Sequence, residues 1–254
     1  MLIKYYQQSL GKSKDGQSLY EHSFDCVKIA HEIISKYGEG HDQYPQEYID
    51  QLLFSTFIHD VGKLNNSFQQ MLISIIAGER PKVTSKHEVH TLEFVDMIQS
   101  SEKEIKNHLS ERLMYKFTSP ININIALSFA VTHHGLYYLS FEGQDLNNVV
   151  PKIRRELRVF NDAEIYRITL TDLLFKYHPF GGIVIVADRI ASYCHEIDRD
   201  FEDVFGEVNS LRELIQMLTS RQIEEKIDLI QSREKTFNYE MKYTLKLLLG
   251  SLNA

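Results

Sequence analysis

The sequence has few cysteines, no long apolar run and no excess of positive charge. Its two cysteines, Cys26 and Cys194, lie far apart with no paired spacing. We therefore expect reduced, buried thiols, as in a cytoplasmic protein. No run approaches the roughly 18–20 apolar residues of a membrane span. The N-terminal stretch Met-Leu-Ile-Lys-Tyr-Tyr-Gln-Gln also lacks the apolar centre of a signal peptide. These absences predict a cytoplasmic protein with no membrane segment.

The charge balance excludes one way of binding nucleic acid. The formal net charge is −7, with 28 lysines and arginines against 35 acidic residues. A protein of this charge does not hold nucleic acid by electrostatic attraction alone. A nuclease is still compatible with it, because bound divalent cations would concentrate positive charge where a phosphate must sit. Histidine is the one anomaly of composition, at 11 of 254 residues.

Helix signals follow one another along the chain, and no strand-like segments pair with each other. Ser18-Leu19-Tyr20-Glu21 is a capping box that opens a helix ending at Gly38. Residues 1–17 are expected to be an irregular entry, and residues 136–162 a long loop. Further helices are expected over residues 45–60, 67–77, 85–98, 102–117, 124–132, 163–177, 181–192 and from 210 to the C-terminus. The pattern predicts a single all-α domain over residues 1–254.

One stretch combines a buried helix with metal-ligand chemistry. An apolar helix runs into His59-Asp60, and Gly62, which we expect to stop the helix, and Lys63 follow. Imidazole and carboxylate ligands suit Zn, Fe, Mn, Ni or Mg. His41-Asp42 is a second such pair in a polar loop, so a histidine–aspartate pair alone does not define a site. His59-Asp60 is the stronger candidate because it follows an apolar helix and because other candidate ligands accompany it in the sequence.

Further candidate ligands fall at the ends or inner faces of other expected helices. They are His22, His87 or His90, His133, His134 and Asp188. Histidines and carboxylates on facing helices of a bundle are a recurrent way to build a dinuclear metal site. Two bound ions can clamp a phosphoryl group and generate hydroxide. The pattern predicts two divalent ions, with Mn, Mg, Fe, Ni and Co as candidates.

The order of these residues resembles the HD superfamily of metal-dependent phosphohydrolases. It is more similar to the HD nuclease of type I CRISPR systems, the domain that accompanies the interference helicase. The resemblance lies in Leu19-Tyr20-Glu21-His22, His59-Asp60-Val61-Gly62-Lys63 followed by Phe68-Gln69, Lys86-His87-Glu88 with Thr91, His133-His134-Gly135, and Ala187-Asp188-Arg189 with Ser192. It spans residues 19–192, and residues 193–254 are expected to be C-terminal helices without an assigned role. The resemblance implies an HD-domain helical bundle with the metal site at its centre.

The resemblance also implies a role for each matching residue. His22, His59, Asp60 and Asp188 would hold one ion, and Asp60, His87, His133 and His134 the other. His87 matches the family's His-Glu pattern, with His90 as the alternative. Lys63 would steady charge on the phosphate, and Ser192 or Arg189 would orient Asp188.

We therefore expect a divalent-metal-dependent nuclease that cleaves single-stranded DNA, or RNA, in CRISPR interference. No Gly-x-x-x-x-Gly-Lys-Ser/Thr motif is present, so the helicase partner would be a separate chain, with the effector complex involved indirectly. The alternative is a phosphohydrolase of the same superfamily acting on dNTPs or nucleoside monophosphates. A non-enzymatic scaffold that keeps the fold is a third reading, but the intact ligand motifs disfavour it. Tyr137, Tyr138 and Phe141 would either stack on bases or belong to the core.

Overall fold

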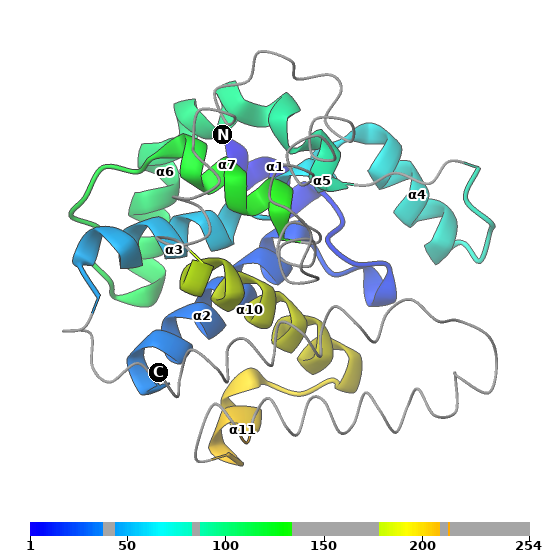
Figure 1. Cartoon of the computed structure of the whole chain (residues 1–254). Coiled ribbons are helices and arrows are strands. Elements are labelled where there is room, and N and C mark those ends of the chain that lie inside the picture. Colours follow the sequence, from blue (N-terminus) through cyan, green and yellow to red (C-terminus); the bar gives the residue numbers. More distant parts are fainter. Residues whose placement is uncertain (38–43, 83–86, 134–177, 209–212, 214–254) are drawn as a thin grey trace, which may run out of the picture.

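The computed structural model describes residues 1–37, 44–82, 87–133, 178–208 and 213, which form helices joined by turns (Figure 1). No strand occurs in these ranges, so the all-α prediction is confirmed for this part of the chain. The elements are α1 (Leu2–Gln8), η1 (Lys14–Gly16), α2 (Leu19–Tyr37), α3 (Gln46–Ile58), η3 (Val61–Leu64), α4 (Asn66–Ile76), α5 (His87–His90), η4 (Thr91–Phe94), α6 (Val95–Leu113), α7 (Ile123–Thr132), α10 (His178–Ile197) and α11 (Phe201–Gly206). None of these helices is long and apolar enough to cross a membrane.

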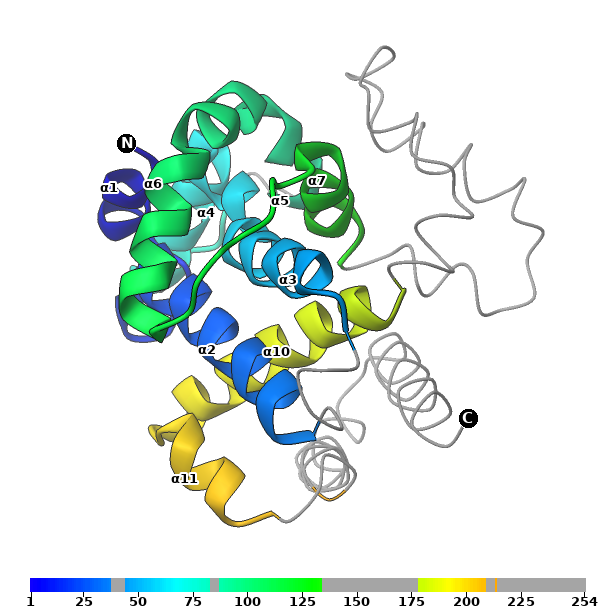
Figure 2. The same ribbon diagram turned by 90° about the vertical axis from the view of Figure 1, so that its left-hand side faces the viewer.

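Helix α3 forms the centre of the molecule. Every residue from Ile49 to Ile58 is buried, so other elements must surround this helix on all sides. Helices α2, α6, α7 and α10 all pack against α3. Figure 2 shows α3 between α7 and the α2–α10 pair. The C-terminal end of α3, where His59 follows, therefore lies inside the protein.

Helix α10 packs against α2, and the two helices cross (Figure 1). Its β-branched run could also suit a strand, but no strand occurs among the described residues to pair with it. Val184, Ala187 and Ile190 instead turn one buried face toward α2 and α3. The helix predicted over residues 181–192 is thus confirmed, and it carries Asp188 into the interior.

The capping box that opens α2 is also confirmed. The Ser18 backbone N–H donates to Glu21 Oε2 at 2.9 Å, and the Glu21 N–H donates to Ser18 Oγ at 3.1 Å. These two bonds satisfy backbone donors that the first turn would otherwise leave unpaired. They fix the start of α2, and with it the face of the helix on which His22 lies.

Other boundaries differ from those expected from the sequence. Residues 2–8 are helical, because Leu2, Ile3 and Tyr6 pack into the core. Residues 95–113 form one continuous helix where two were expected. Helix α4 begins at Asn66, one residue before the expected start, and is capped by Asn65, whose side chain accepts from the Ser67 N–H at 2.9 Å. The loop expected over 136–162 and the helices expected over 163–177 and from 210 onward lie outside the described residues, except for residue 213.

Candidate metal centre

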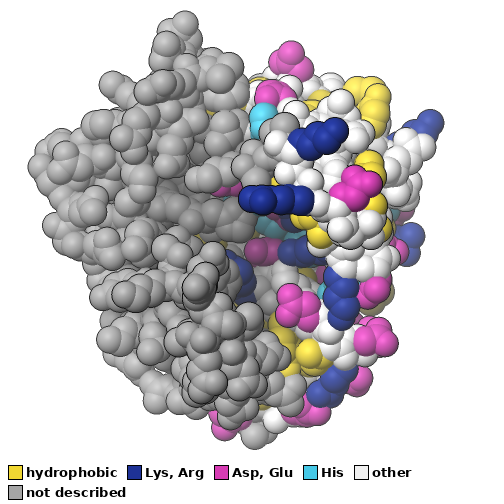
Figure 3. Space-filling model, turned by 90° about the vertical axis from the view of Figure 1, so that its right-hand side faces the viewer, with side chains coloured by type: hydrophobic (Ala, Val, Ile, Leu, Met, Phe, Trp, Pro, Cys, Tyr) yellow, Lys and Arg dark blue, Asp and Glu magenta, His cyan; other side chains and the backbone are white. Residues whose placement is uncertain are grey.

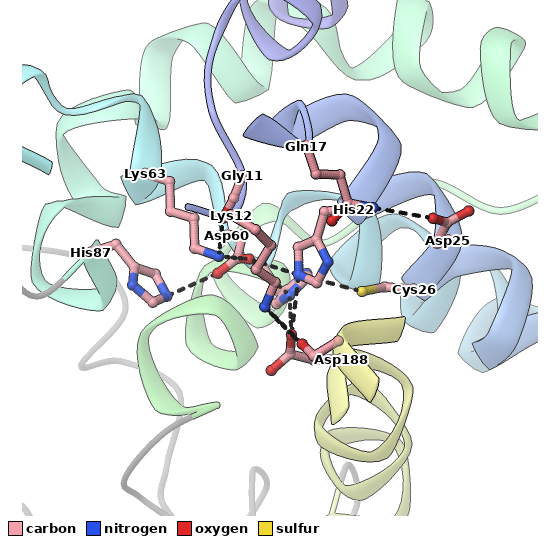
Figure 4. Close-up of polar contacts among 12 residues, drawn as sticks. Gly11, Lys12, Gln17, His22, Asp25, Cys26, Asp60, Lys63, His87 and Asp188 are labelled. Carbon is pink, nitrogen blue, oxygen red and sulfur yellow. Dashed lines mark hydrogen bonds and ion pairs between the residues drawn. The ribbon is translucent and has the colours of Figure 1, made fainter. Parts of the chain in front are cut away.

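Side chains from α2, the α3–η3 turn, α5, the end of α7 and α10 meet in one buried place (Figure 4). Their ligand atoms form two groups, and within each group these atoms lie within 4.8 Å of one another. The first group is His22, Cys26, His59 and Asp188, and the second is Asp60, His87 and His133. All seven side chains are buried, as a shielded metal site requires.

Asp60 lies between the two groups, and each of its oxygens faces one of them. Oδ1 is 2.8 Å from His87 Nε2 and 3.6 Å from His133 Nε2. Oδ2 is 3.2 Å from His22 Nε2 and 3.4 Å from His59 Nε2. A carboxylate in this position can serve as a ligand to both groups at once.

His59 and His133 are oriented by the same local device. Each follows the last turn of a helix, α3 or α7, and places Nδ1 2.6 Å from the carbonyl oxygen three residues earlier, on Thr56 or Ala130. A carbonyl oxygen only accepts, so Nδ1 carries the proton and Nε2 presents a lone pair to the cluster. This backbone-fixed tautomer is the usual arrangement of a metal-binding histidine.

The donor set fits divalent metal ions. His59 Nε2 is buried and has no hydrogen-bond partner, and leaving a polar atom in that state costs free energy. An ion ligated there would remove this cost. Imidazole and carboxylate donors suit first-row divalent metals. The residues therefore fit divalent metal ions as ligands.

Burial also keeps the ring of His59 ready to accept a metal. It lowers the pKa of His59 to about 4, even though Asp60 favours the charged form. Burial likewise lowers the pKa of His87, again against the influence of Asp60. Near neutral pH His59 is uncharged and its lone pair is available.

Each carboxylate of the cluster has a lysine beside it. Lys63 Nζ lies 2.6 Å from Asp60 Oδ2 and donates to the Gly11 carbonyl at 3.0 Å. Lys12 Nζ lies 3.6 Å from Asp188 Oδ1 and donates to Ser192 Oγ at 2.7 Å. Burial would raise the pKa values of both carboxyls, but the charge of Lys63 holds the pKa of Asp60, and that of Lys12 the pKa of Asp188, well below the ordinary range. Both carboxylates are thus ionised and able to bind cations.

Gly62 permits the contact that brings α5 to the site. A Cβ atom on Gly62 would lie 1.8 Å from the carbonyl oxygen of His87 and 3.0 Å from the Thr91 nitrogen. Its expected role as the helix stop was wrong, because α3 already ends at Ile58 and Gly62 lies inside the short helix η3. Only a residue without a side chain lets η3 and α5 pack this closely, which places His87 beside Asp60.

The Phe68-Gln69 pair supports the site from α4. Gln69 Oε1 accepts from the Leu10 N–H at 2.9 Å, and its Nε2 donates to the Leu10 carbonyl at 2.9 Å and to the Lys63 carbonyl at 2.7 Å. The ring of Phe68 meets the ring of His87 edge to face, with centroids 5.2 Å apart. Gln69 therefore holds the N-terminal segment beside the cluster, and Phe68 packs against the ring of His87, a candidate ligand.

Most of the sequence-predicted site residues converge here. The structure brings together His22, His59, Asp60, Lys63, His87, His133 and Asp188. His90 lies apart from them, with Nδ1 2.6 Å from Glu93 Oε1 near the surface. Ser192 donates to Asp188 at 3.4 Å, in keeping with an orienting role. His134, Tyr137, Tyr138 and Phe141 lie outside the described residues.

His87 and His90 form a matched pair for testing ligand roles. Both belong to α5, but only His87 approaches Asp60. We expect His87→Asn to reduce metal-dependent hydrolysis at least about tenfold, the scale of losses seen even for outer-shell partners of metal ligands. His90→Asn should change it less than about threefold. Activity and metal content measured on both variants test this, and the reverse ranking would reassign the ligand.

Sequence reasoning missed two residues of the cluster. Lys12 belongs to a segment with no helical pattern, so nothing in the sequence pointed to its position beside Asp188. Cys26 was expected to be an ordinary buried thiol. Its spacing of four residues from His22, on one face of α2, was the signal that it could share the site.

A buried cluster of histidines and aspartates from several helices, with an adjacent histidine–aspartate pair between two ligand groups, defines an HD-type metal-binding domain. The comparison with protein families agrees: the model described as "Cas3, HD domain" matches residues 9–196. The chain therefore belongs to this family of metal-dependent nucleases of CRISPR systems. Comparisons with curated proteins and with solved structures gave no match.

Proposed function

We propose that this protein cleaves single-stranded DNA with two divalent ions, as the nuclease of CRISPR interference in the cytoplasm. The observation that carries the proposal is the placement of Asp60, whose two oxygens face two separate groups of ligands. When bound, two such ions supply Lewis acidity at the phosphate and lower the pKa of an attacking water. A partner helicase would deliver the strand, with the effector complex acting through it.

The ligand roles follow from the two groups. His22, His59 and Asp188, with Asp60 Oδ2, would hold the first ion, and His87 and His133, with Asp60 Oδ1, the second. His134, next to His133 in sequence, would complete the second set, as the family resemblance implies. In this arrangement Asp60 would be a ligand of both ions and would keep their positions fixed relative to each other.

Lys63 and Lys12 would have different roles in the site. Lys63 is almost completely buried and bonded to both Asp60 and the Gly11 carbonyl, which suits it to orienting Asp60. The side chain of Lys12 is 26% exposed, against 6% for Lys63. Lys12 is therefore the better placed of the two to meet the charge of an incoming phosphate. We therefore propose Lys12 for the role that the family resemblance implies for Lys63, and the role of Lys63 stays a prediction.

The surface supports a single-stranded substrate. Figure 3 shows acidic and basic side chains interspersed over the described part of one face, and no basic stripe forms there. With a net charge of −7, the protein would make few phosphate contacts beyond the metal centre. The ligand side chains are buried, so the nucleic-acid strand must bend to bring the scissile phosphate to them. A flexible single strand can do this, whereas duplex DNA is stiff.

A direct assay separates this function from its alternative. Metal-loaded protein is incubated with labelled single-stranded DNA, single-stranded RNA, blunt duplex DNA and free dNTPs, with and without a chelator. We expect chelator-sensitive cleavage of the single strand, little cutting of the duplex and a shallow dependence on salt. RNA in place of DNA as the better substrate would change the substrate class. Rapid turnover of dNTPs with no strand cleavage would instead identify a nucleotide phosphohydrolase.

A further inference from the structure

Cys26 lies within the first group of metal ligands. It follows His22 by one turn of α2, so both side chains leave the same face of the helix. The thiol is fully buried, and Sγ is 3.8 Å from His22 Nε2. Figure 4 shows the sulfur pointing toward the His22 ring. The other cysteine, Cys194, belongs to neither ligand group among the described residues.

The distances suit a shared ion. Zinc binds sulfur at about 2.3 Å and imidazole nitrogen at about 2.0–2.1 Å, so a tetrahedral site separates these two atoms by about 3.5 Å. The observed distance from Cys26 Sγ to His22 Nε2 is close to this value, at 3.8 Å. Asp188 Oδ1 lies 3.1 Å from His22 Nε2 and 4.0 Å from His59 Nε2. All four atoms lie within 4.8 Å of one another and so converge on one position.

A second, independent observation points to a ligand in the same space. His59 is completely buried, and its Nε2 has no hydrogen-bond partner although Nδ1 is fixed by the Thr56 carbonyl. This nitrogen and the Cys26 sulfur belong to the same group of four ligand atoms. A group that binds both atoms must accept nitrogen and sulfur donors, which is the chemistry of a thiophilic divalent metal.

We propose that Cys26 is a ligand of the first ion, together with His22, His59, Asp188 and Asp60 Oδ2, and that this position prefers Zn²⁺, Fe²⁺ or Co²⁺ to Mn²⁺ or Mg²⁺. The inference rests on the proposed function, because it specifies the ion at one half of the same site. On binding, the S–H bond breaks and its proton leaves to solvent. The sulfur then donates an electron pair to the ion, and no atom changes oxidation state.

The proposal makes the two positions chemically different. The second group offers His87, His133 and an Asp60 oxygen, all of them nitrogen or oxygen donors. Such a set accepts Mn²⁺ readily, whereas a thiolate shifts preference toward softer ions. A protein loaded with two kinds of metal would then hold the softer ion on the α2–α10 side.

Cobalt spectroscopy of the full chain tests the proposal. The wild type, Cys26→Val and Cys194→Val are titrated with Co²⁺ alone, and Zn²⁺ and Mn²⁺ affinities are measured by competition with a chelator. We expect a thiolate-to-cobalt charge-transfer band in the wild type and in Cys194→Val, and no such band in Cys26→Val, which keeps its visible d–d bands. Zn²⁺ affinity should fall at least about tenfold in Cys26→Val, with Mn²⁺ affinity changed less than about threefold.

The other outcomes are distinguishable. Visible d–d bands without a charge-transfer band in the wild type would overturn the ligand role of Cys26 and leave the metal centre standing. No Co²⁺ binding at all would overturn the metal centre and this inference together. If Cys26→Val fails to fold, Cys194→Val still decides the question. Cys26 is then the only cysteine left, and a surviving band in that variant can come from no other residue, whereas its loss would contradict the proposal.

Discussion

Replacing Asp60 by asparagine is expected to abolish metal-dependent hydrolysis while leaving the helices in place. Asparagine keeps the size of the side chain but offers one oxygen acceptor where the carboxylate has two. Its amide nitrogen would replace one of the two carboxylate oxygens. That nitrogen would then face the ring nitrogens of either His22 and His59 or His87 and His133. We expect the rate to fall at least about 100-fold, at the upper end of losses reported for outer-shell partners. Metal content measured by elemental analysis should fall with it.

The control for this variant is a carboxylate outside the cluster. Asp25 lies on α2 and forms a partly exposed ion pair with Lys28 at 2.8 Å. Asp25→Asn should keep its metal and its activity, because exposed ion pairs contribute little to stability. Helical circular dichroism checks that both variants are folded. An Asp60→Asn protein with wild-type metal content and rate would remove Asp60 from the site.

Gly62→Ala is expected to have the second largest effect, through the backbone alone. The added Cβ would lie 1.8 Å from the His87 carbonyl oxygen, a distance that no relaxation of a side chain can relieve. Helix α5 must move outward, and His87 with it. Overpacking of this kind typically costs about 1–3 kcal/mol and sometimes more. We expect a loss of at least about 3 kcal/mol in the free energy of unfolding, and weaker metal binding by the Asp60–His87–His133 group.

Gly206→Ala is the control for Gly62→Ala. A Cβ there would meet nothing within 4 Å, and its position at the end of α11 suits alanine. Gly206→Ala should therefore leave stability within about 0.5 kcal/mol and metal binding unchanged. Urea unfolding and metal titration of both variants make the comparison. If Gly62→Ala also stays within that range and binds metal normally, the close contact between η3 and α5 does not position His87.

The elements that sequence predicted best are those with both a start signal and a long apolar pattern. Helix α2 has the Ser18 capping box and buries Cys26, Ile29 and Ile33 along one face. Helix α1 has neither, since it covers seven residues and its cap, Met1, makes no side-chain hydrogen bond. Such a short helix is stabilised mainly by tertiary packing, here against α2 and α6. Sequence periodicity could not reveal it.

Some residues of the candidate site could be predicted from the sequence, and others could not. His59 and Asp60 stand out in the sequence because an adjacent histidine and aspartate follow an apolar helix. The contribution of Lys12 depends on a chain path that Gln69 holds in place with hydrogen bonds to Leu10. The function of Gly62 depends on the approach of a helix that begins some 25 residues later. Contacts of this kind become visible only when the chain is folded.

Anomalous X-ray scattering from crystals of the metal-loaded protein tests the central claim most directly. The account predicts two ion peaks roughly 3.5–4 Å apart, on either side of the Asp60 carboxylate. One peak should be surrounded by His22, His59 and Asp188, and the other by His87 and His133. Scattering peaks located elsewhere, or no ion within ligand distance of Asp60, would contradict a metal centre built around this residue.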